Sequence, residues 1–401
     1  MAKTKSQSQS EQKKLKKKQA KAAPQKTPEE LYALAIESLE RSEPEKAQSY
    51  AQDLLSQVDP DLISSKSLSD ANPNKLSLPV LNLLGEISVE LGDVDNARRY
   101  FLLAVKVDPD GGIADEAGGG AEKFLWLAQL SEEGGADSVR WYERGVAALK
   151  AQIDALRNTP RDAQEKEVLE NEKRASIATA LCSVVEVYMT DLSWEDDAEA
   201  RCESLVIEAL AFAPDSAEVL QTLASVRLSQ LKQQDAQLAL TRSMGLWKNL
   251  DPEDDEVPDY PTRISLARLL MEAEMEDEAM VVLERLALED DQSVEACYLG
   301  GWCLYLLAEK RRKTEATNDV AYGHNEANDD TLKASRKWLL NTIKLYQLQE
   351  YEDDRLRDHT TELVGELNKI LGPIPEDADA DEEAEEWADE EDSEDEEMAG
   401  T

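Results

Sequence analysis

Side chains suited to acid–base or metal chemistry are scarce in this sequence. The chain contains two histidines, His324 in a loop-like segment and His359 in a polar helical segment. They predict neither a metal cluster nor a serine–histidine–aspartate constellation. Carboxylates are abundant, but acid–base catalysis needs two of them in contrasting environments, and 86 Asp and Glu residues make chance pairs inevitable. We therefore expect no catalytic residue, no metal site, no cofactor and no enzymatic activity.

Two further motifs have simpler explanations than a ligand site. The triple glycine at 118–120 is not followed by the Gly-Lys-Ser/Thr of a phosphate-binding loop, so it predicts a flexible linker between repeats. The run DADADEEAEE at 377–386 lacks the glycine and flanking helices of an EF-hand and predicts a simple polyanion. Four cysteines lie in apolar helical stretches without a CxxC pair, which predicts buried, reduced thiols. They are Cys182, Cys202, Cys297 and Cys303.

The charge of the chain predicts a basic partner. The formal net charge is −42, which would repel nucleic acid and anionic membrane surfaces. Because of this charge we expect no direct nucleic-acid binding. No stretch approaches 18 consecutive apolar residues, so we expect no membrane association either. Residues 1–28 carry nine Lys and one Glu, whereas residues 376–397 carry 16 Asp or Glu and no basic residue. These ends predict a disordered basic arm at 1–28 and a disordered acidic tail at 373–401.

The basic arm has two interpretations. Its segment KKLKKKQAK at 13–21 resembles a nuclear-import signal, which would place the protein in the cytoplasm and the nucleus and make import factors its partners. The alternative is an arm that binds the acidic tail and balances its charge.

Apolar residues three and four apart recur from Pro28 onward and predict helical hairpins. The second hairpin, LNLLGEISVELGDVDNARRYFLLAVKVDPDG, resembles the tetratricopeptide repeat. In that family a small residue lets the first helix approach its partner, and an alanine followed four positions later by an aromatic residue packs the second helix. Gly85, Ala97, Phe101 and Ala104 hold these places, and Pro109 ends the unit.

Weaker copies of this pattern extend the resemblance along the chain. Their first-helix markers are Ala128, Ala224, Ala267 and Gly300, and a further pair at 182–189 and 202–214 has a lengthened connection. About seven hairpins and a capping helix at Asp354–Leu371 would form a repeat domain at 29–372. The expected fold is therefore all-α, a tetratricopeptide-like helical-hairpin solenoid. Segments expected to be loops are 110–120, 251–261 and 311–330.

The first helices of stacked hairpins line the concave side of a solenoid in this family. We assign a partner-binding concave face to acidic and amide residues expected there, with an ordinary solvated face as the alternative. These residues are Asn82, Glu86, Glu90, Glu132, Glu133, Glu186 and Glu272. Cochaperones that clamp acidic chaperone tails carry Lys, Asn and Arg on this face, so the inverted charge here predicts a basic peptide. Residues expected to pack in the core are Trp126, Trp141, Trp302 and Trp338.

The whole arrangement resembles the fungal assembly chaperones of the large-subunit ribosomal protein L-four. The resemblance rests on the Lys-rich arm, the second hairpin, the segment EALAFAPDSAEVLQTLASVRL and the tail sequence EEAEEWADEEDSE. It implies capture of the newly made ribosomal protein, shielding of a long extended internal loop, passage into the nucleus and release on the pre-ribosome. The acidic charge agrees with such a basic client. An acidic histone chaperone or another protein-binding repeat scaffold is the alternative.

Overall fold

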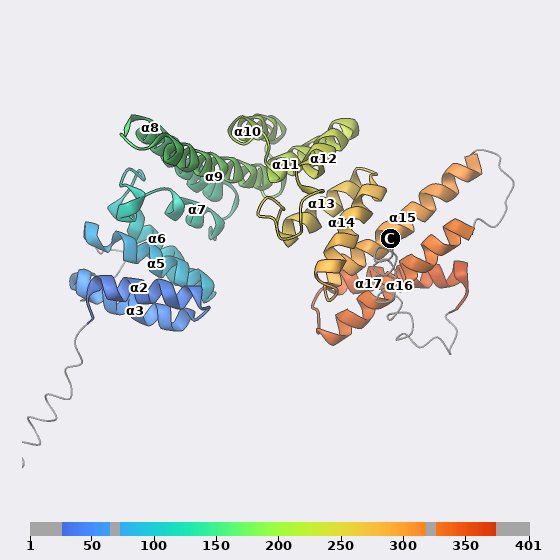
Figure 1. Ribbon diagram of the computed structural model, residues 1–401, viewed down its shortest axis with the longest axis horizontal. Coiled ribbons are helices and arrows are strands. Elements are labelled where there is room, and N and C mark those ends of the chain that lie inside the picture. The colour runs from blue at the N-terminus through green and yellow to red at the C-terminus, as the bar shows by residue number, and fades with distance from the viewer. Residues whose placement is uncertain (1–25, 65–72, 318–325, 374–401) are drawn as a thin grey trace, which may run out of the picture. The chain divides into compact units, whose positions relative to one another are not determined.

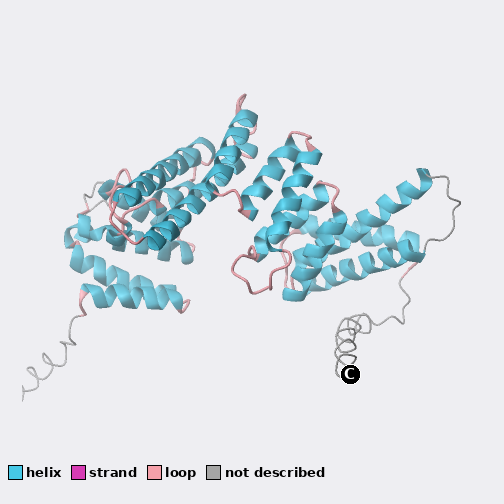
Figure 2. Ribbon diagram, turned by 45° about the horizontal axis from the view of Figure 1, so that its top comes forward, coloured by secondary structure: helices cyan, strands magenta, loops and turns pink. Residues whose placement is uncertain are grey.

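The computed structural model describes residues 26–64, 73–317 and 326–373, all of them in helices or in the connections between helices (Figure 1). Figure 2 shows no strand in these ranges. The predicted all-α class is therefore confirmed. Residues 1–25 of the predicted arm, residues 374–401 of the predicted tail and His324 lie outside the described residues, so the arm and tail boundaries stay predictions.

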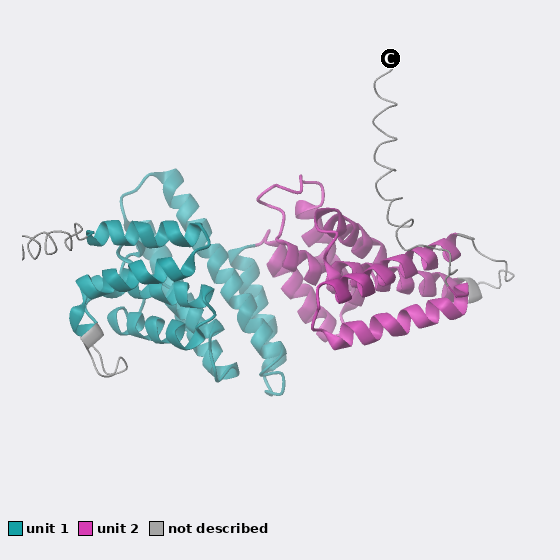
Figure 3. Cartoon of the chain, turned by 90° about the horizontal axis from the view of Figure 1, so that it is seen from below, with its two compact units in different colours: residues 1–213 teal, residues 214–401 magenta. Residues whose placement is uncertain are grey.

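Residues 1–213 form the first of two structural units (Figure 3). Its described helices pair in chain order, each second helix packing against the first helix of its pair. The pairs are α2 (Pro28–Glu40) with α3 (Pro44–Val58), α5 (Leu78–Glu90) with α6 (Val94–Val107), α7 (Glu122–Gln129) with α8 (Gly135–Asn158), and α9 (Ala163–Met189) with α10 (Ala198–Phe212). The short helix α4 (Pro60–Ser64) and the 3₁₀ turns η2 (Lys75–Ser77) and η3 (Asp115–Ala117) lie in connections.

Residues 214–401 form the second unit, which has the same kind of pairing. Its pairs are α11 (Ala217–Ser229) with α12 (Gln233–Trp247), α13 (Tyr260–Glu272) with α14 (Glu276–Glu289), and α15 (Val294–Thr317) with α16 (Glu326–Leu348). The last helix, α17 (Asp354–Leu371), spans the residues expected for a terminal cap and packs on α15 and α16. Leu363, Val364 and Leu367 form its buried face.

Short polar residues and prolines start these helices. The Thr27 side chain accepts a hydrogen bond from the Glu30 backbone N–H, and the Glu30 carboxylate accepts one from the Thr27 N–H, while Pro28 takes the first helical position.

The turn between the two helices of a pair has a recurrent backbone conformation. Gly92 has a φ of 70°, and Ser42, Leu231 and Glu274 adopt the same left-handed conformation at the matching point of other pairs.

In two pairs the small residue of the first helix lies against an aromatic ring of the second helix. A Cβ atom added to Gly85 would lie 2.6 Å from the Phe101 ring, and one added to Gly300 would lie 2.3 Å from the Trp338 ring. In these two pairs, α5 with α6 and α15 with α16, the helices therefore approach as closely as a glycine permits. Phe101 is fully buried, together with Ala97 and Leu127.

Two of the predicted loops are shorter than expected. Residues 311–317 belong to α15, where Lys, Arg, Glu and Ala favour a helix even without an apolar face, and residues 326–330 belong to α16. Residues 318–325 lie outside the described part. Tyr260 and Pro261 form the first turn of α13, which Asp259 caps through the Thr262 N–H.

The connection within the fourth pair is lengthened, as the sequence predicted: residues 190–197 join α9 to α10, whereas three residues join α2 to α3 and α5 to α6. The start of the pair was predicted wrongly, because α9 begins at Ala163, far before the expected Cys182. The early turns of α9 pack beside the long helix α8, and ion pairs such as Arg157 with Glu170 at 2.7 Å replace an apolar seam there. A hydrophobic pattern does not detect this kind of helix.

The cysteine prediction is confirmed, because all four thiols are buried and none of them forms a disulfide bond. Burial raises the pKa of Cys297 to about 11 and that of Cys303 to about 12, so both thiols are protonated at neutral pH. Within the described ranges, no helix has the length and apolar character needed to cross a bilayer.

The glycine contact gives a stability prediction. Gly85→Ala should lower the free energy of unfolding by about 1–2 kcal/mol, because the buried Phe101 ring has no room to retreat and overpacking outweighs the better helix propensity of alanine. Gly365→Ala in α17 is the matched control, since nothing lies within 4 Å of its added Cβ. Thermal unfolding followed by circular dichroism measures both. Equal or greater stability of Gly85→Ala would contradict the packing account.

Candidate partner-binding groove

Helix α5 places three of the predicted binding residues on one face. Asn82, Glu86 and Glu90 are four residues apart, which is about one helical turn, so they point the same way. Asn82 and Glu86 are half-buried and Glu90 is exposed. The other side of the helix carries Leu84 and Ile87, which are fully buried. The amphipathic pattern that packs α5 therefore also turns its polar row away from the core.

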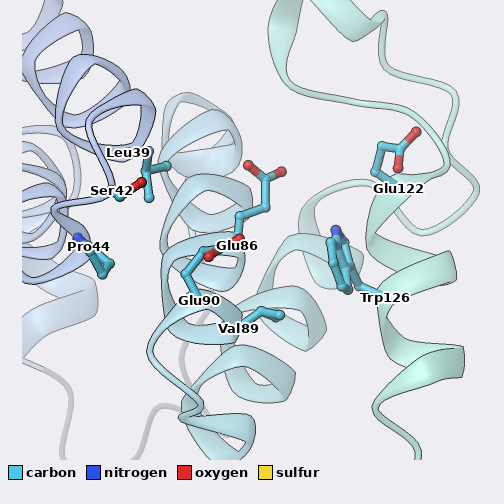
Figure 4. A pocket seen from close by; sticks show the side chains of 8 residues that line it. All are labelled: Leu39, Ser42, Pro44, Glu86, Val89, Glu90, Glu122 and Trp126. Carbon is cyan, nitrogen blue, oxygen red and sulfur yellow. The ribbon is translucent and has the colours of Figure 1, made fainter. Parts of the chain in front are cut away.

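Two adjoining cavities lie along this row of α5. The larger has a volume of about 770 Å³ and is lined by Leu39, Ser42, Pro44, Glu86, Val89, Glu90, Glu122 and Trp126 (Figure 4). The smaller, of about 370 Å³, shares Glu86 and Glu122 with it. Residues that line only the smaller cavity include Tyr32, Asn82, Asp115, Gly118, Glu172 and Lys173. We call the two cavities together the acidic groove.

The carboxylates of the acidic groove lack a matching set of cations. Burial raises the pKa of Glu86, and the negative charge of Glu122 raises it further. Burial likewise raises the pKa of Glu122, with Asp115 adding to the effect and Lys173 opposing it. Within the described residues, no salt bridge engages Glu86, Glu90 or Glu122.

The one basic side chain among the described residues of the groove lining is already engaged. The Lys173 Nζ lies 2.6 Å from Asp115 Oδ2 and donates a hydrogen bond of 2.8 Å to Gln152 Oε1. It neutralises one carboxylate of the smaller cavity, and no other described residue supplies a counterion to the larger cavity. The groove is therefore a half-enclosed anionic site.

Aromatic rings form part of the wall. Trp126 stacks on the buried Phe101 with ring centroids 6.1 Å apart and an interplanar angle of 8°, while it also lines the larger cavity. Trp126 therefore packs against the core, as predicted, and also faces the larger cavity, which was not predicted. Tyr32 of α2, which is 39% exposed, lines the smaller cavity. Aromatic rings beside carboxylates suit a lysine or arginine, because its cation is attracted both to the face of a ring and to a carboxylate.

The triple glycine forms a wall of the groove, which corrects its interpretation as a flexible linker. The Asn82 Nδ2 donates a hydrogen bond of 2.7 Å to the Gly118 carbonyl. Gly118 has a φ of 73° and approaches Pro79 so closely that a Cβ there would lie 2.7 Å from the proline. Only glycine allows both this backbone conformation and this approach. Asn82 thus fastens the loop, and its Oδ1 is buried without a hydrogen-bond partner among the described residues.

A buried ion pair holds the same loop from behind. Lys123 is fully buried, and its Nζ donates to Asp108 Oδ2 at 2.8 Å and to the Gly120 carbonyl at 2.5 Å. Asp108 also accepts a hydrogen bond from the Ile113 N–H. Burial lowers the pKa of Lys123, while its contact with Asp108 opposes that shift. The pair fixes the residues that place Asp115 and Glu122 at the groove.

Four of the predicted residues lie outside the groove. Glu132 and Glu133 were expected on a first helix, but α7 ends at Gln129, so both lie in the turn before α8. There Glu132 pairs with Arg98 at 3.2 Å. Glu186 is exposed on α9, and Glu272 is the exposed last residue of α13 in the second unit. The structure brings together Asn82, Glu86 and Glu90 and not these four.

The sequence reasoning missed Glu122, Asp115 and Glu172 as groove residues. Glu122 opens α7, the first helix of the third pair, and its position about one turn before Trp126 places the two side chains on the same face of that helix. No local pattern marks Asp115, because a folded loop brings it there. Within the described residues, no group of three or more His, Cys, Asp or Glu side chains is arranged to hold a metal ion.

The fold and the groove define a tetratricopeptide-type repeat protein, and comparisons with known proteins narrow this class. No family model matches the chain. A "Probable assembly chaperone of rpl4" from Emericella nidulans is 52% identical over 321 residues, which cover 79% of this chain and 78% of the relative. A protein of the same description from Schizosaccharomyces pombe is 34% identical over 313 residues, covering 78% and 86%.

A solved structure agrees with these relatives. The structure described as "Assembly Chaperone of RpL4 (Residues 1-338)" is 48% identical, covers 72% of this chain and all of that chain, and superposes with a TM-score of 0.65. The chain therefore belongs to the family of assembly chaperones of rpl4. This confirms the resemblance stated from the sequence.

The raised carboxyl pKa values give a second prediction. Glu86 and Glu122 have a folded-state pKa above the ordinary value of 4.5, so their contribution to stability falls as the pH rises from that value through the folded pKa. The double variant Glu86→Gln/Glu122→Gln should therefore melt at a higher temperature than the native chain at pH 7. The gain should shrink towards pH 4, where the native carboxyls are protonated.

The matched control for this measurement is Glu186→Gln, which removes an exposed charge outside the groove. It should change the melting temperature little at either pH. A melting temperature at pH 7 that is lower for the double variant than for the native chain would show that these carboxylates stabilise the fold.

Proposed function

We propose that this protein is a dedicated chaperone that binds newly made large-subunit ribosomal protein L-four and shields it until its incorporation into pre-ribosomes. Family membership supports the client, since relatives that are 52% and 34% identical are described as assembly chaperones of rpl4. The observation that supports the binding mode is the acidic groove, whose carboxylates lack counterions among the described residues.

The groove suits an extended basic segment. It offers three closely spaced carboxylates, Glu86, Glu90 and Glu122, and the exposed face of Trp126. A bound Lys or Arg gains ionic hydrogen bonds and a ring contact, and it relieves the repulsion between Glu86 and Glu122. The two cavities are too small for a folded domain but fit the side chains of a strand-like segment, in which neighbours are about 3.3 Å apart. We therefore place an internal loop of the client there.

Shielding follows from the same charges. A ribosomal protein carries many Lys and Arg side chains that bind RNA phosphates, and a chain with a net charge of −42 competes for those side chains. The chaperone then acts as a temporary substitute for ribosomal RNA. Release follows when the real site on the pre-ribosome offers a denser anionic surface.

Removing the groove charges tests this binding mode. The variant Glu86→Gln/Glu90→Gln/Glu122→Gln should bind L-four at least about tenfold more weakly, because loss of contacts worth about 0.5–1.5 kcal/mol each exceeds the 1.4 kcal/mol that corresponds to a factor of ten. Titration calorimetry at fixed ionic strength measures the affinity. The matched control is Glu133→Gln/Glu186→Gln/Glu272→Gln, which removes the same number of charges outside the groove.

The control variant should retain an affinity for L-four within about threefold of that of the native chain, since it changes only the long-range electrostatic field of the protein. Equal losses in the two variants would show that net charge, not the groove, captures the client. Recovery of histones in place of L-four by the native chain in cells would overturn the choice of client.

We also propose that the protein works in both cytoplasm and nucleus and that residues 13–21 serve as its import signal. The support is the density of lysines in KKLKKKQAK. Deleting residues 1–25 leaves the first described helix intact and should reduce nuclear accumulation of a fluorescent fusion several-fold. Fluorescence microscopy measures the ratio between nucleus and cytoplasm, and an unchanged ratio would remove the import role.

A further inference from the structure

The acidic groove raises the question of what neutralises it before a client arrives. Its larger cavity combines an apolar wall, formed by Leu39, Val89 and Trp126, with carboxylates that repel one another. The chain itself contains a segment of matching chemistry. In KKLKKKQAK, lysines surround one leucine, Leu15. We propose that residues 13–21 occupy the acidic groove of their own chain in the absence of client, so that the client must displace them.

The basic segment joins the fold beside the groove. Lys26, the first described residue, rests its Nζ 4.3 Å from the centroid of the Tyr50 ring, and its carbonyl accepts a hydrogen bond of 3.4 Å from Gln57 Nε2. Helix α2 begins two residues later.

Helix α2 itself borders both cavities. Tyr32 near its start lines the smaller cavity, and Leu39 near its end lines the larger one. Helix α2 therefore runs along the groove from the point where the segment is attached.

The length of the chain permits this docking. Five residue steps separate Lys21 from Lys26, and thirteen separate Lys13 from Lys26, which allows extended spans of about 17 Å and about 45 Å. The distance to be covered along α2, from Pro28 at its start to Leu39, is about 17 Å at the helical rise per residue. The segment reaches both cavities without any change in α2.

The side-chain pattern matches the two kinds of wall. In an extended segment, neighbouring side chains point in opposite directions, so Leu15 faces one way while Lys14 and Lys16 face the other. Leu15 fits the apolar wall of the larger cavity, and the lysines on either side meet Glu86, Glu90 and Glu122. A purely cationic segment would leave that apolar wall uncovered.

Tethering favours the groove over the acidic tail as the site for this segment. The groove and the attachment point lie within the same helical pairs, so the short tether gives a high effective concentration. The tail residues 376–397 are the competing anion, and they begin after the last helix of the second unit. A lysine bound in the groove also relieves the repulsion between Glu86 and Glu122 in their partly buried space.

Occupation of the groove makes client capture competitive. The apparent dissociation constant for a basic segment rises by the inverse of the fraction of grooves that are free. Weak basic ligands are then rejected, while a client with many contacts displaces the arm. This consequence rests on the proposed function, whereas the docking itself does not require a client.

Zero-length crosslinking of the full chain without client tests the docking. A carbodiimide joins a lysine to a carboxylate that it touches, and a dilute sample with the monomer recovered after the reaction restricts the products to those within one chain. Mass spectrometry should find Lys13–Lys21 linked to Glu86, Glu90 or Glu122. The variant Glu86→Gln/Glu90→Gln/Glu122→Gln should lose these products. Crosslinks from Lys13–Lys21 that map only to residues 376–397, or no crosslink to the groove, would overturn the proposal.

A binding measurement provides an independent readout. A fluorescent synthetic peptide of alternating Lys and Leu should bind about tenfold more tightly when Lys13, Lys14, Lys16, Lys17, Lys18 and Lys21 are all replaced by Gln, because the groove is then free. In the groove variant, the same six replacements should not change the affinity. An unchanged affinity in the chain with an intact groove would contradict the proposal. Weak binding of L-four to a chain that still gives the groove crosslinks would contradict the proposed function alone.

Discussion

The close approach of two helices at a glycine is the constraint on which the rest of this structure depends. At Gly85 the Phe101 ring fills the space of a missing side chain, and Trp338 does the same at Gly300. A pair joined in this way still has an apolar face that only the next pair can cover. The array of pairs follows from this need. The division of α5 into a packed side and a polar side follows from the same need. Residues of α5 that face neither its partner helix nor the adjacent pair remain available to a ligand.

The acidic groove shows how such an array gains a function at some expense of stability. Glu86 and Glu122 approach each other from α5 and α7 in a partly buried space, where both charges are unfavourable. A loop fixed by the buried pair of Lys123 and Asp108 forms the adjoining wall. Rigid elements thus hold carboxylates in an arrangement that a basic ligand relieves, which is the condition for binding energy to come from the ligand and not from rearrangement.

The periodicity of the sequence predicted the features that one helix determines by itself. It identified the marker residues Gly85 and Phe101 on their helices, the buried cysteines and the polar row of Asn82, Glu86 and Glu90. It failed where residues distant in the chain determine the outcome. The hydrogen bond from Asn82 to the Gly118 carbonyl and the pair of Lys123 with Asp108 fold a loop that composition alone describes as a linker.

Helix ends were the other source of error. Helix α7 ends at Gln129, so Glu132 and Glu133 lie in a turn and not on a first helix. Helices α9 and α15 extend through polar stretches that are stabilised by ion pairs and helix propensity. A hydrophobic pattern carries no signal for either. Helix α17 was predicted well, because a cap keeps one regular apolar face, with Leu363 and Leu367 on it.

The central claim is that the acidic groove holds a basic segment of ribosomal protein L-four. Site-specific photocrosslinking tests it most directly, with a benzophenone side chain in place of Val89, which lines the groove between Glu86 and Glu90. The control position is Leu238 on α12, which is 71% exposed in the second unit. We expect irradiation of the complex to join position 89, and not position 238, to one Lys- and Arg-rich internal segment of L-four. A crosslink from position 238 alone would contradict the claim and place the client elsewhere.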